Sequence, residues 1–228
     1  MIVYDSPELR VAWYKNFLKM IMAGAGENQT HCLSVGARQT LFQICRAVGA
    51  KRVLDLGTCM GVSALTLAVA VGPGGQVVTV DIVDVNADGW LWDTKDVVSG
   101  RPSELMRCAG VADRVVFVQS CAADFLLGGT DLFDLAFLDA SHSPGETYRE
   151  LLGCLDRVKP GGLVVMDDVF VDNQPIDPGG WSIAGPWLAL EALKLARPGT
   201  EYQLIGANID GSPTRMALLV VPDVDVAE

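Results

Sequence analysis

Residues 53–81 of this 228-residue chain read VLDLGTCMGVSALTLAVAVGPGGQVVTVD and predict one complete strand–helix–strand unit. The apolar run 53–56 is typical of a buried strand, and residues 63–71 of a helix that the glycine-rich turn 72–75 ends. A second apolar run, 77–80, predicts the next strand. Two buried strands joined by a helix indicate a parallel sheet covered on both faces.

The same alternation of apolar runs and helical segments continues along the chain. Buried strands are predicted at 115–118, 134–138 and 163–166, and helices at 8–22, 36–48 and 146–158, the last ended by Lys-Pro-Gly-Gly at 159–162. Residues 201–205 and 216–221 flank a turn rich in glycine, asparagine and proline, which predicts an antiparallel hairpin. We therefore expect a single α/β domain over 1–228, with an N-terminal helical cap at 1–35.

The composition excludes several function classes. Half of the residues are hydrophobic and the net charge is −11, which is typical of a globular protein without a phosphate-backbone partner. Residues 1–52 carry seven basic and three acidic residues, which leaves a small opening for nucleic acid. The chain shows no leader and no apolar run of about 18 residues, so we expect a cytoplasmic protein that does not span a membrane. The six scattered cysteines are expected to be reduced.

A glycine turn follows the first strand of the unit. The spacing Asp55-x-Gly57-x-x-x-Gly61 lets a ligand approach the backbone at the start of a helix, but it is not the G-x-G-x-x-G pattern of dinucleotide sites. Asp81 ends the next strand, 20 residues after Gly61, where a carboxylate can accept both hydroxyls of a ribose. The alternatives are a purely structural turn and a solvated carboxylate.

Acidic residues stand at several predicted strand ends. Asp139 follows one strand and the pair Asp167-Asp168 follows the next, so the three carboxylates are expected at one edge of the sheet. Carboxylates that converge repel one another unless a cation lies among them. Oxygen ligands suit Mg²⁺, Mn²⁺ or Ca²⁺ and not Zn²⁺, which prefers histidine and cysteine. The pattern therefore predicts a divalent-cation site.

The stretch VLDLGTCMGVS at 53–63, the pair Val80-Asp81 and the stretch LDRVKPGG at 155–162 resemble the class I S-adenosylmethionine-dependent methyltransferases. The resemblance covers about residues 35–221 and implies a Rossmann-like, seven-stranded, mostly parallel sheet whose last strand is antiparallel. It implies that Asp55 and Gly57 lie along the methionine part of the cofactor, that Asp81 holds the ribose and that the segment 121–124 borders the adenine. The cofactor-binding residues that it implies are Asp55, Gly57, Gly61, Ser63, Asp81, Ala122, Ala123 and Asp139.

Two further stretches, FLDASHS at 137–143 and VMDDV at 165–169, resemble the metal-dependent O-methyltransferases of the catechol and caffeoyl-CoA type. They are still more similar to the bacterial branch that methylates sugar hydroxyls on macrolides and related natural products, because the catechol type usually has Asp-Asn where this chain has Asp167-Asp168. The resemblance implies that Asp139, Asp167 and Asp168 bind the metal.

His142 stands three residues after Asp139, at a position where the catechol type carries a lysine base and some sugar methyltransferases a histidine. With an unperturbed pKa of about 6.5, histidine is well suited as a general base near neutral pH. We expect His142 and Asp139 to be catalytic; the alternative for His142 is a loop residue that caps the following helix. His31, the other histidine, is expected at the surface.

Residues 170–187 follow the last metal-binding position and are rich in proline, glycine and aromatic residues. A loop of that length is typical of a substrate lid. Trp181 and Trp187 are candidates for stacking on a sugar or aromatic ring, and the alternative for each is packing in the core.

Together these features predict Mg²⁺-dependent methyl transfer from S-adenosylmethionine to a hydroxyl of a small molecule. The acceptor is either a natural-product sugar or polyketide hydroxyl, or a catechol or phenol. The alternatives are a tRNA-hydroxyl methyltransferase of the same family, which the acidic charge disfavours, and an inactive methyltransferase-like binding module, which would have lost ligand residues. The glycine spacing argues against a dehydrogenase that binds NAD. The resemblance also implies a homodimer.

Overall fold

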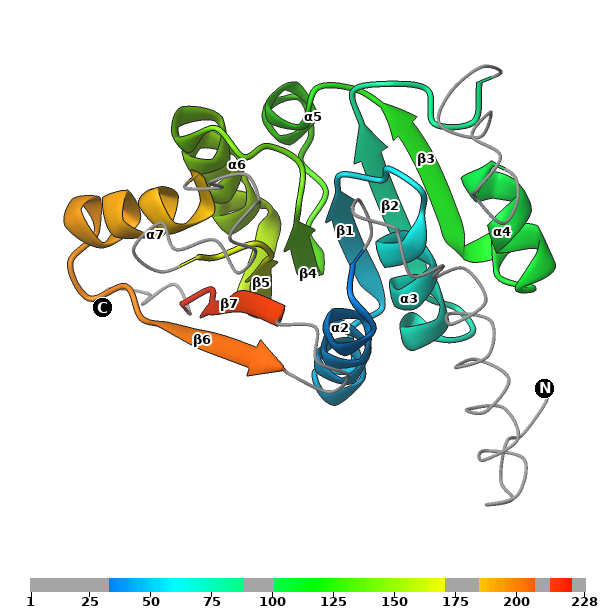
Figure 1. Cartoon of the computed structure of the whole chain (residues 1–228), viewed down its shortest axis with the longest axis horizontal. Coiled ribbons are helices and arrows are strands. Elements are labelled where there is room, and N and C mark those ends of the chain that lie inside the picture. Colours follow the sequence, from blue (N-terminus) through cyan, green and yellow to red (C-terminus); the bar gives the residue numbers. More distant parts are fainter. Residues whose placement is uncertain (1–32, 88–100, 171–184, 208–213, 223–228) are drawn as a thin grey trace, which may run out of the picture.

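The computed structural model describes residues 33–87, 101–170, 185–207 and 214–222, and within these ranges seven strands form one sheet (Figure 1). The strands are β1 (Arg52–Leu56), β2 (Gln76–Asp81), β3 (Val115–Gln119), β4 (Phe133–Leu138), β5 (Val158–Met166), β6 (Tyr202–Ala207) and β7 (Thr214–Val220). Their order is β3-β2-β1-β4-β5-β7-β6. The pairs from β3 to β5 are parallel, and β7 is antiparallel to both β5 and β6. The predicted fold class is confirmed.

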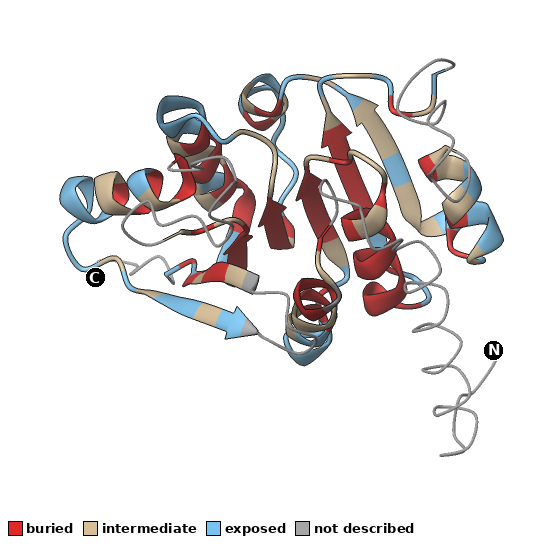
Figure 2. Ribbon diagram, in the orientation of Figure 1, coloured by how far each residue is buried: buried red, intermediate tan, exposed pale blue. Residues whose placement is uncertain are grey.

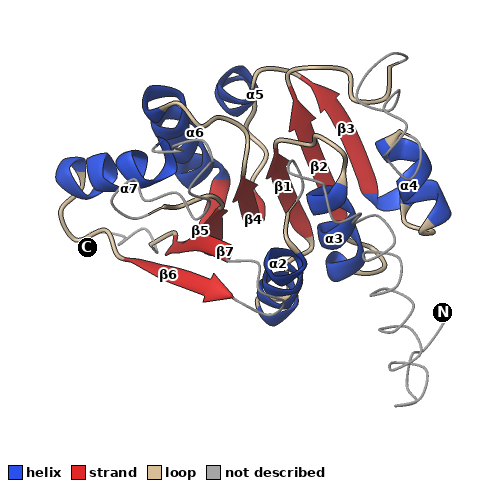
Figure 3. Ribbon diagram, viewed as in Figure 1, coloured by secondary structure: helices blue, strands red, loops and turns tan. Residues whose placement is uncertain are grey.

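Helices cover both faces of this sheet (Figure 3). One face carries α2 (Val35–Ala47), α3 (Val62–Val71) and α4 (Pro102–Cys108), and the other carries α5 (Ala122–Gly128), α6 (Pro144–Arg157) and α7 (Gly185–Ala196). Successive side chains of a strand point to opposite faces, so Val53 packs under α2 and α3 while Leu54 packs under the second helical layer. The central strands are therefore buried along almost their whole length (Figure 2).

Helix α3 is anchored at both ends. Its N-cap is Gly61, with a φ of 78°, and a Cβ there would lie 2.8 Å from the Cβ of Pro102. At the other end, three basic side chains from outside α3 donate to carbonyls of its last turn: Arg46, Lys51 and Arg114. Positive charge at a helix C-terminus offsets its partial negative charge. The N-terminus of α3 is thereby presented to the edge of the sheet where β1 ends.

Two predicted segments differ in part from the structure. The segment 159–162 follows the end of α6, as predicted, but it also belongs to β5, where Gly161 donates its N–H to Val221 and Gly162 accepts the N–H of Val221, each over 2.9 Å. The expected loop 170–187 ends earlier, since α7 begins at Gly185. Trp187 therefore stands in a helix, half-buried and packed against the core, which favours the core alternative.

Several predictions fall outside the described residues. These are residues 1–32 of the cap predicted at 1–35, with the helix at 8–22 and His31, and residues 171–184 of the predicted loop, with Trp181. Of the described cysteines, Cys45 and Cys154 are buried, whereas Cys108 and Cys121 are exposed. None of the described helices is long and apolar enough to cross a membrane.

Candidate active site

The glycine turn after β1 passes directly beside the end of β4. Gly57 has a φ of +99°, and a Cβ at this position would overlap the carbonyl oxygen of Asp139. Backbone hydrogen bonds fix this crossing, since Gly57 donates its N–H to Val80 and Asp139 donates its N–H to Leu56, each over 2.9 Å. A glycine is therefore needed here, both because the backbone is left-handed and because two backbone segments of the chain approach each other closely.

Asp55, in β1, lies completely buried behind this turn. Its Oδ2 accepts the hydroxyl of Thr79 over 2.6 Å and that of Ser63 over 3.2 Å, whereas its Oδ1 has no hydrogen-bond partner among the described residues. Burial raises the pKa of Asp55 to about 7, against the lowering effect of the two hydroxyls. A buried acceptor without a partner is costly, and it fits a carboxylate that takes a donor from a bound ligand.

Asp81 ends β2 and is half-buried. Its Oδ2 accepts the N–H of Cys59 over 2.9 Å and its Oδ1 accepts the N–H of Val83 over 3.2 Å. The carboxylate thus orients Cys59, which has a φ of 44° in the middle of the glycine turn.

The candidate adenine segment reaches the same edge of the sheet. Ala122 is buried and Ala123 half-buried in the first turn of α5, directly after β3. The N–H of Ser120 donates to the carbonyl of Asp81 over 2.8 Å, which ties the loop before α5 to the end of β2. The structure thus brings the candidate ribose and adenine segments together.

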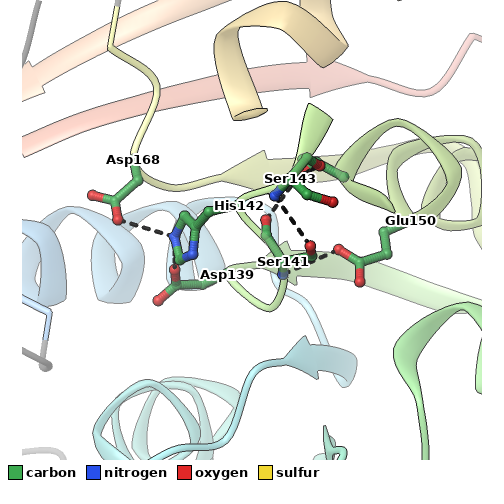
Figure 4. Close-up of polar contacts among 7 residues, drawn as sticks. Asp139, Ser141, His142, Ser143, Glu150 and Asp168 are labelled. Carbon is green, nitrogen blue, oxygen red and sulfur yellow. Dashed lines mark hydrogen bonds and ion pairs between the residues drawn. The ribbon is translucent and has the colours of Figure 1, made fainter. Parts of the chain in front are cut away.

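Asp139, His142 and Asp168 form a cluster at the ends of β4 and β5 (Figure 4). Nε2 of His142 lies 3.2 Å from Oδ2 of Asp168 and 3.7 Å from Oδ1 of Asp139. One ligand atom from each of the three residues lies within 4.8 Å of the other two. Asp168 has a φ of 53°, a left-handed conformation that is uncommon for residues with a Cβ, although aspartate adopts it more readily than most. Such strain is often found at functional sites, and here it accompanies the carboxylate that reaches His142.

The electrostatics of this cluster favour a cation. The pKa of Asp139 is raised by burial and by its neighbours Asp167 and Asp168. Burial and the charge of Asp168 raise the pKa of Asp167 to about 8. The pKa of His142 is raised chiefly by its hydrogen bond to Asp168. Without a metal ion, the imidazolium is therefore the cation that offsets these carboxylates.

Residues 54–169 match a family described as a methyltransferase domain. The catechol O-methyltransferase of Mycobacterium tuberculosis is 31% identical over 173 residues, which cover 74% of this chain and 67% of the relative. The chain belongs to the S-adenosylmethionine-dependent O-methyltransferases of the catechol and caffeoyl-CoA family. A probable caffeoyl-CoA O-methyltransferase of Dictyostelium discoideum is 26% identical over 66% of this chain and 62% of the relative. The chain thus spans only half to two thirds of its curated relatives.

Solved structures share this fold. Cofactor-bound Rv0187 from MTB superposes with a TM-score of 0.66 at 25% identity, over 98% of this chain and 94% of that one. The O-methyltransferase TomG of Streptomyces achromogenes, solved in complex with S-adenosylmethionine, has a TM-score of 0.69 over 93% of this chain and 95% of that one. At 23% identity the latter likeness supports the fold alone.

For a member of this O-methyltransferase family, the donor atoms at the cluster fit a divalent cation. Two carboxylates and an imidazole nitrogen are ligand types that Mn²⁺ accepts, and carboxylates alone suit Mg²⁺. Asp168 belongs to the cluster, whereas Asp167 is buried beside it and lies outside the group of three ligand atoms. The metal-binding role predicted for Asp167 stays a prediction.

Two residues that support the candidate site, Thr79 and Glu150, are not among those predicted from the sequence. Thr79 bonds to Asp55, and its signal was a polar side chain inside the apolar run 77–80. Glu150 supports the segment that carries His142, and its signal was an acidic residue on the buried side of α6. Neither polar residue can be recognised as functional in the sequence unless the residue that it contacts is already known.

Proposed function

We propose that this chain transfers a methyl group from S-adenosylmethionine to a hydroxyl of a small molecule and requires a divalent cation such as Mg²⁺. The observation that carries the proposal is the cluster of Asp139, His142 and Asp168 next to the glycine turn. Relatives named for catechol and caffeoyl-CoA support a catechol or phenol acceptor. A natural-product sugar or polyketide hydroxyl is the other proposed acceptor, and the pair Asp167-Asp168 supports it.

The proposed cofactor site lies along the ends of β1, β2, β3 and β4. Asp81, which is half-buried at the end of β2, would accept the ribose hydroxyls. Asp55 would take a donor from the methionine part through Oδ1. The remaining proposed contacts are Gly57, Gly61, Ser63, Ala122, Ala123 and Asp139. A cationic cofactor at this edge reduces the repulsion among its carboxylates.

At the reacting end, we propose that Asp139, Asp167 and Asp168 hold the cation and that His142 is the general base. The bound cation supplies positive charge that lowers the pKa of the acceptor hydroxyl. His142 takes the proton at Nδ1, because Nε2 is hydrogen-bonded to Asp168 over 3.2 Å, and that carboxylate stabilises the resulting imidazolium. Most of the acceleration comes from alignment of the hydroxyl with the methyl group.

A methyl-transfer screen with labelled S-adenosylmethionine tests the proposal. The panel contains catechols, phenols, glycosylated natural products and bulk tRNA, each with Mg²⁺ and with EDTA. We expect label on a small hydroxylated molecule, lost in EDTA and restored by Mg²⁺. Full activity in EDTA would remove the metal from the proposal, and label on tRNA alone would overturn the acceptor class.

A further inference from the structure

The segment that carries His142 is bound to α6 through every polar group of the preceding residue, Ser141. The N–H of Ser141 donates to Oε2 of Glu150 over 3.3 Å, and its carbonyl accepts the hydroxyl of Thr147 over 2.7 Å. Its own hydroxyl donates to Oε2 of Glu146 over 2.8 Å. Figure 4 shows Ser141 between His142 on one side and Glu150 on the other. The main chain that enters His142 is therefore tied to the first turns of one helix.

Of the two carboxylates in this arrangement, only that of Glu150 is buried. Its residue is 4% exposed, whereas Glu146 is exposed to solvent. A carboxylate in the interior is costly unless it is hydrogen-bonded, so a buried acid on α6 indicates a role beyond packing. Burial raises the pKa of Glu150 to about 7, against the lowering effect of the Ser141 N–H.

The other side of the segment is confined by α7. A Cβ at Gly185, the first residue of that helix, would overlap the carbonyl oxygen of His142. The main chain at 141–142 is thus held between the first turns of α6 and the start of α7. With its backbone held from both sides, His142 has Nε2 of its ring 3.2 Å from Oδ2 of Asp168.

We propose that Glu150 is a positioning residue, which binds the amide of Ser141 and thereby places His142 opposite Asp168. Its importance for turnover rests on the proposed function, in which His142 is the base. The effect of Glu150 on the order of the segment 141–142 does not rest on the proposed function, because Glu150 contacts Ser141 in the unliganded chain. Small displacements of a catalytic group have large effects on rate.

The test uses the full chain with Glu150→Leu, which removes the acceptor, and Glu150→Gln, which keeps an acceptor oxygen without the charge. Glu146→Gln is the matched control on the same helix, at an exposed carboxylate that binds Ser141 only through its hydroxyl. The first readout is amide hydrogen exchange of Ser141 by NMR without ligands. We expect exchange to rise roughly ten- to a hundredfold in Glu150→Leu and to stay near wild type in the other two variants.

The second readout is the separate effect of each substitution on kcat and on KM, with His142→Ala measured for comparison. In Glu150→Leu we expect kcat to fall roughly ten- to a hundredfold at nearly unchanged KM for S-adenosylmethionine, with most of it restored in Glu150→Gln. Wild-type exchange at Ser141 in Glu150→Leu would overturn the proposal, and so would a wild-type kcat in that variant when His142→Ala is inactive. If His142→Ala is fully active, the base assignment fails, and the exchange measurement still decides the role of Glu150.

Discussion

Replacing Gly57 by alanine tests how the close approach of β1 and β4 builds the site. The residue has a φ of +99°, and an added Cβ would lie 2.7 Å from the carbonyl carbon of Asp139 as well as overlap its oxygen. Neither segment can shift freely, because Asp139 donates its N–H to Leu56 of β1 and Gly57 donates its N–H to Val80 of β2. The new methyl group must therefore push the loop that begins at Asp139 away from the glycine turn.

The expected cost has two parts. A left-handed conformation at a residue with a Cβ costs about 1–2 kcal/mol, and relieving an overlap in a packed region costs about 1–3 kcal/mol more. Gly74→Ala is the matched control, since Gly74 has a φ of +76° and no heavy atom within 4 Å of an added Cβ. It should show the first cost alone. At roughly 2–4 °C per kcal/mol, a total near 3 kcal/mol lowers the Tm of Gly57→Ala by about 6–12 °C.

Thermal unfolding followed by circular dichroism measures these shifts, and calorimetric titration with S-adenosylmethionine measures the consequence for the site. We expect the Tm to fall about twice as far in Gly57→Ala as in Gly74→Ala. At a temperature where both variants are folded, we expect Gly57→Ala to bind the cofactor more weakly than Gly74→Ala does. Equal Tm shifts in the two variants, together with wild-type cofactor affinity in both, would refute the reasoning.

Three further predictions concern individual groups of the site. His142→Ala should keep cofactor affinity and lose roughly 10²–10⁴-fold in kcat, and a wild-type pre-steady-state rate would exclude it as the base. Mg²⁺ or Mn²⁺ should raise the Tm of the wild type but not that of Asp168→Asn, because a ligand that binds only the folded state stabilises it; equal shifts would place the ion elsewhere. Burial raises the pKa of Asp55 from 3.8 to about 7, so between these two pH values the folded chain holds a proton that the unfolded chain has released. The contribution of Asp55 to the free energy of unfolding therefore falls as the pH rises from 3.8 to about 7. Asp55→Asn should flatten that decline in Tm, and an unchanged pH profile would show that the carboxyl is not perturbed.

The central strands of this fold are predictable because each contains a short apolar run between turn or helix signals. The misassigned segments have physical reasons. Helices α4 and α5 have seven residues each, too few to show a helical period, and no helix was predicted there. Gly185 and Pro186 are typical of a loop, yet proline is tolerated in the first turn of a helix, and this is where α7 begins. The segment 159–162 becomes part of β5 only through its pairing with the residue that follows β7.

At the site, the sequence marks Asp139, Asp167 and Asp168 as acids at strand ends, and parallel strands bring their ends to one edge. It does not show which of the adjacent pair faces His142, because that depends on the left-handed conformation of Asp168. The contact of Glu150 with Ser141 depends on how the loop after β4 returns onto α6, and no local pattern encodes that path.

The most direct test of the central claim is a crystal structure with Mn²⁺ and S-adenosylhomocysteine, using the anomalous scattering of manganese to locate the ion. We predict a single strong peak between the carboxylates of Asp139 and Asp168, with the sulfur of the cofactor product on the side of the glycine turn. A map without a peak at this cluster, at saturating Mn²⁺ and with the product bound, would contradict a cation-dependent methyl transfer at this site.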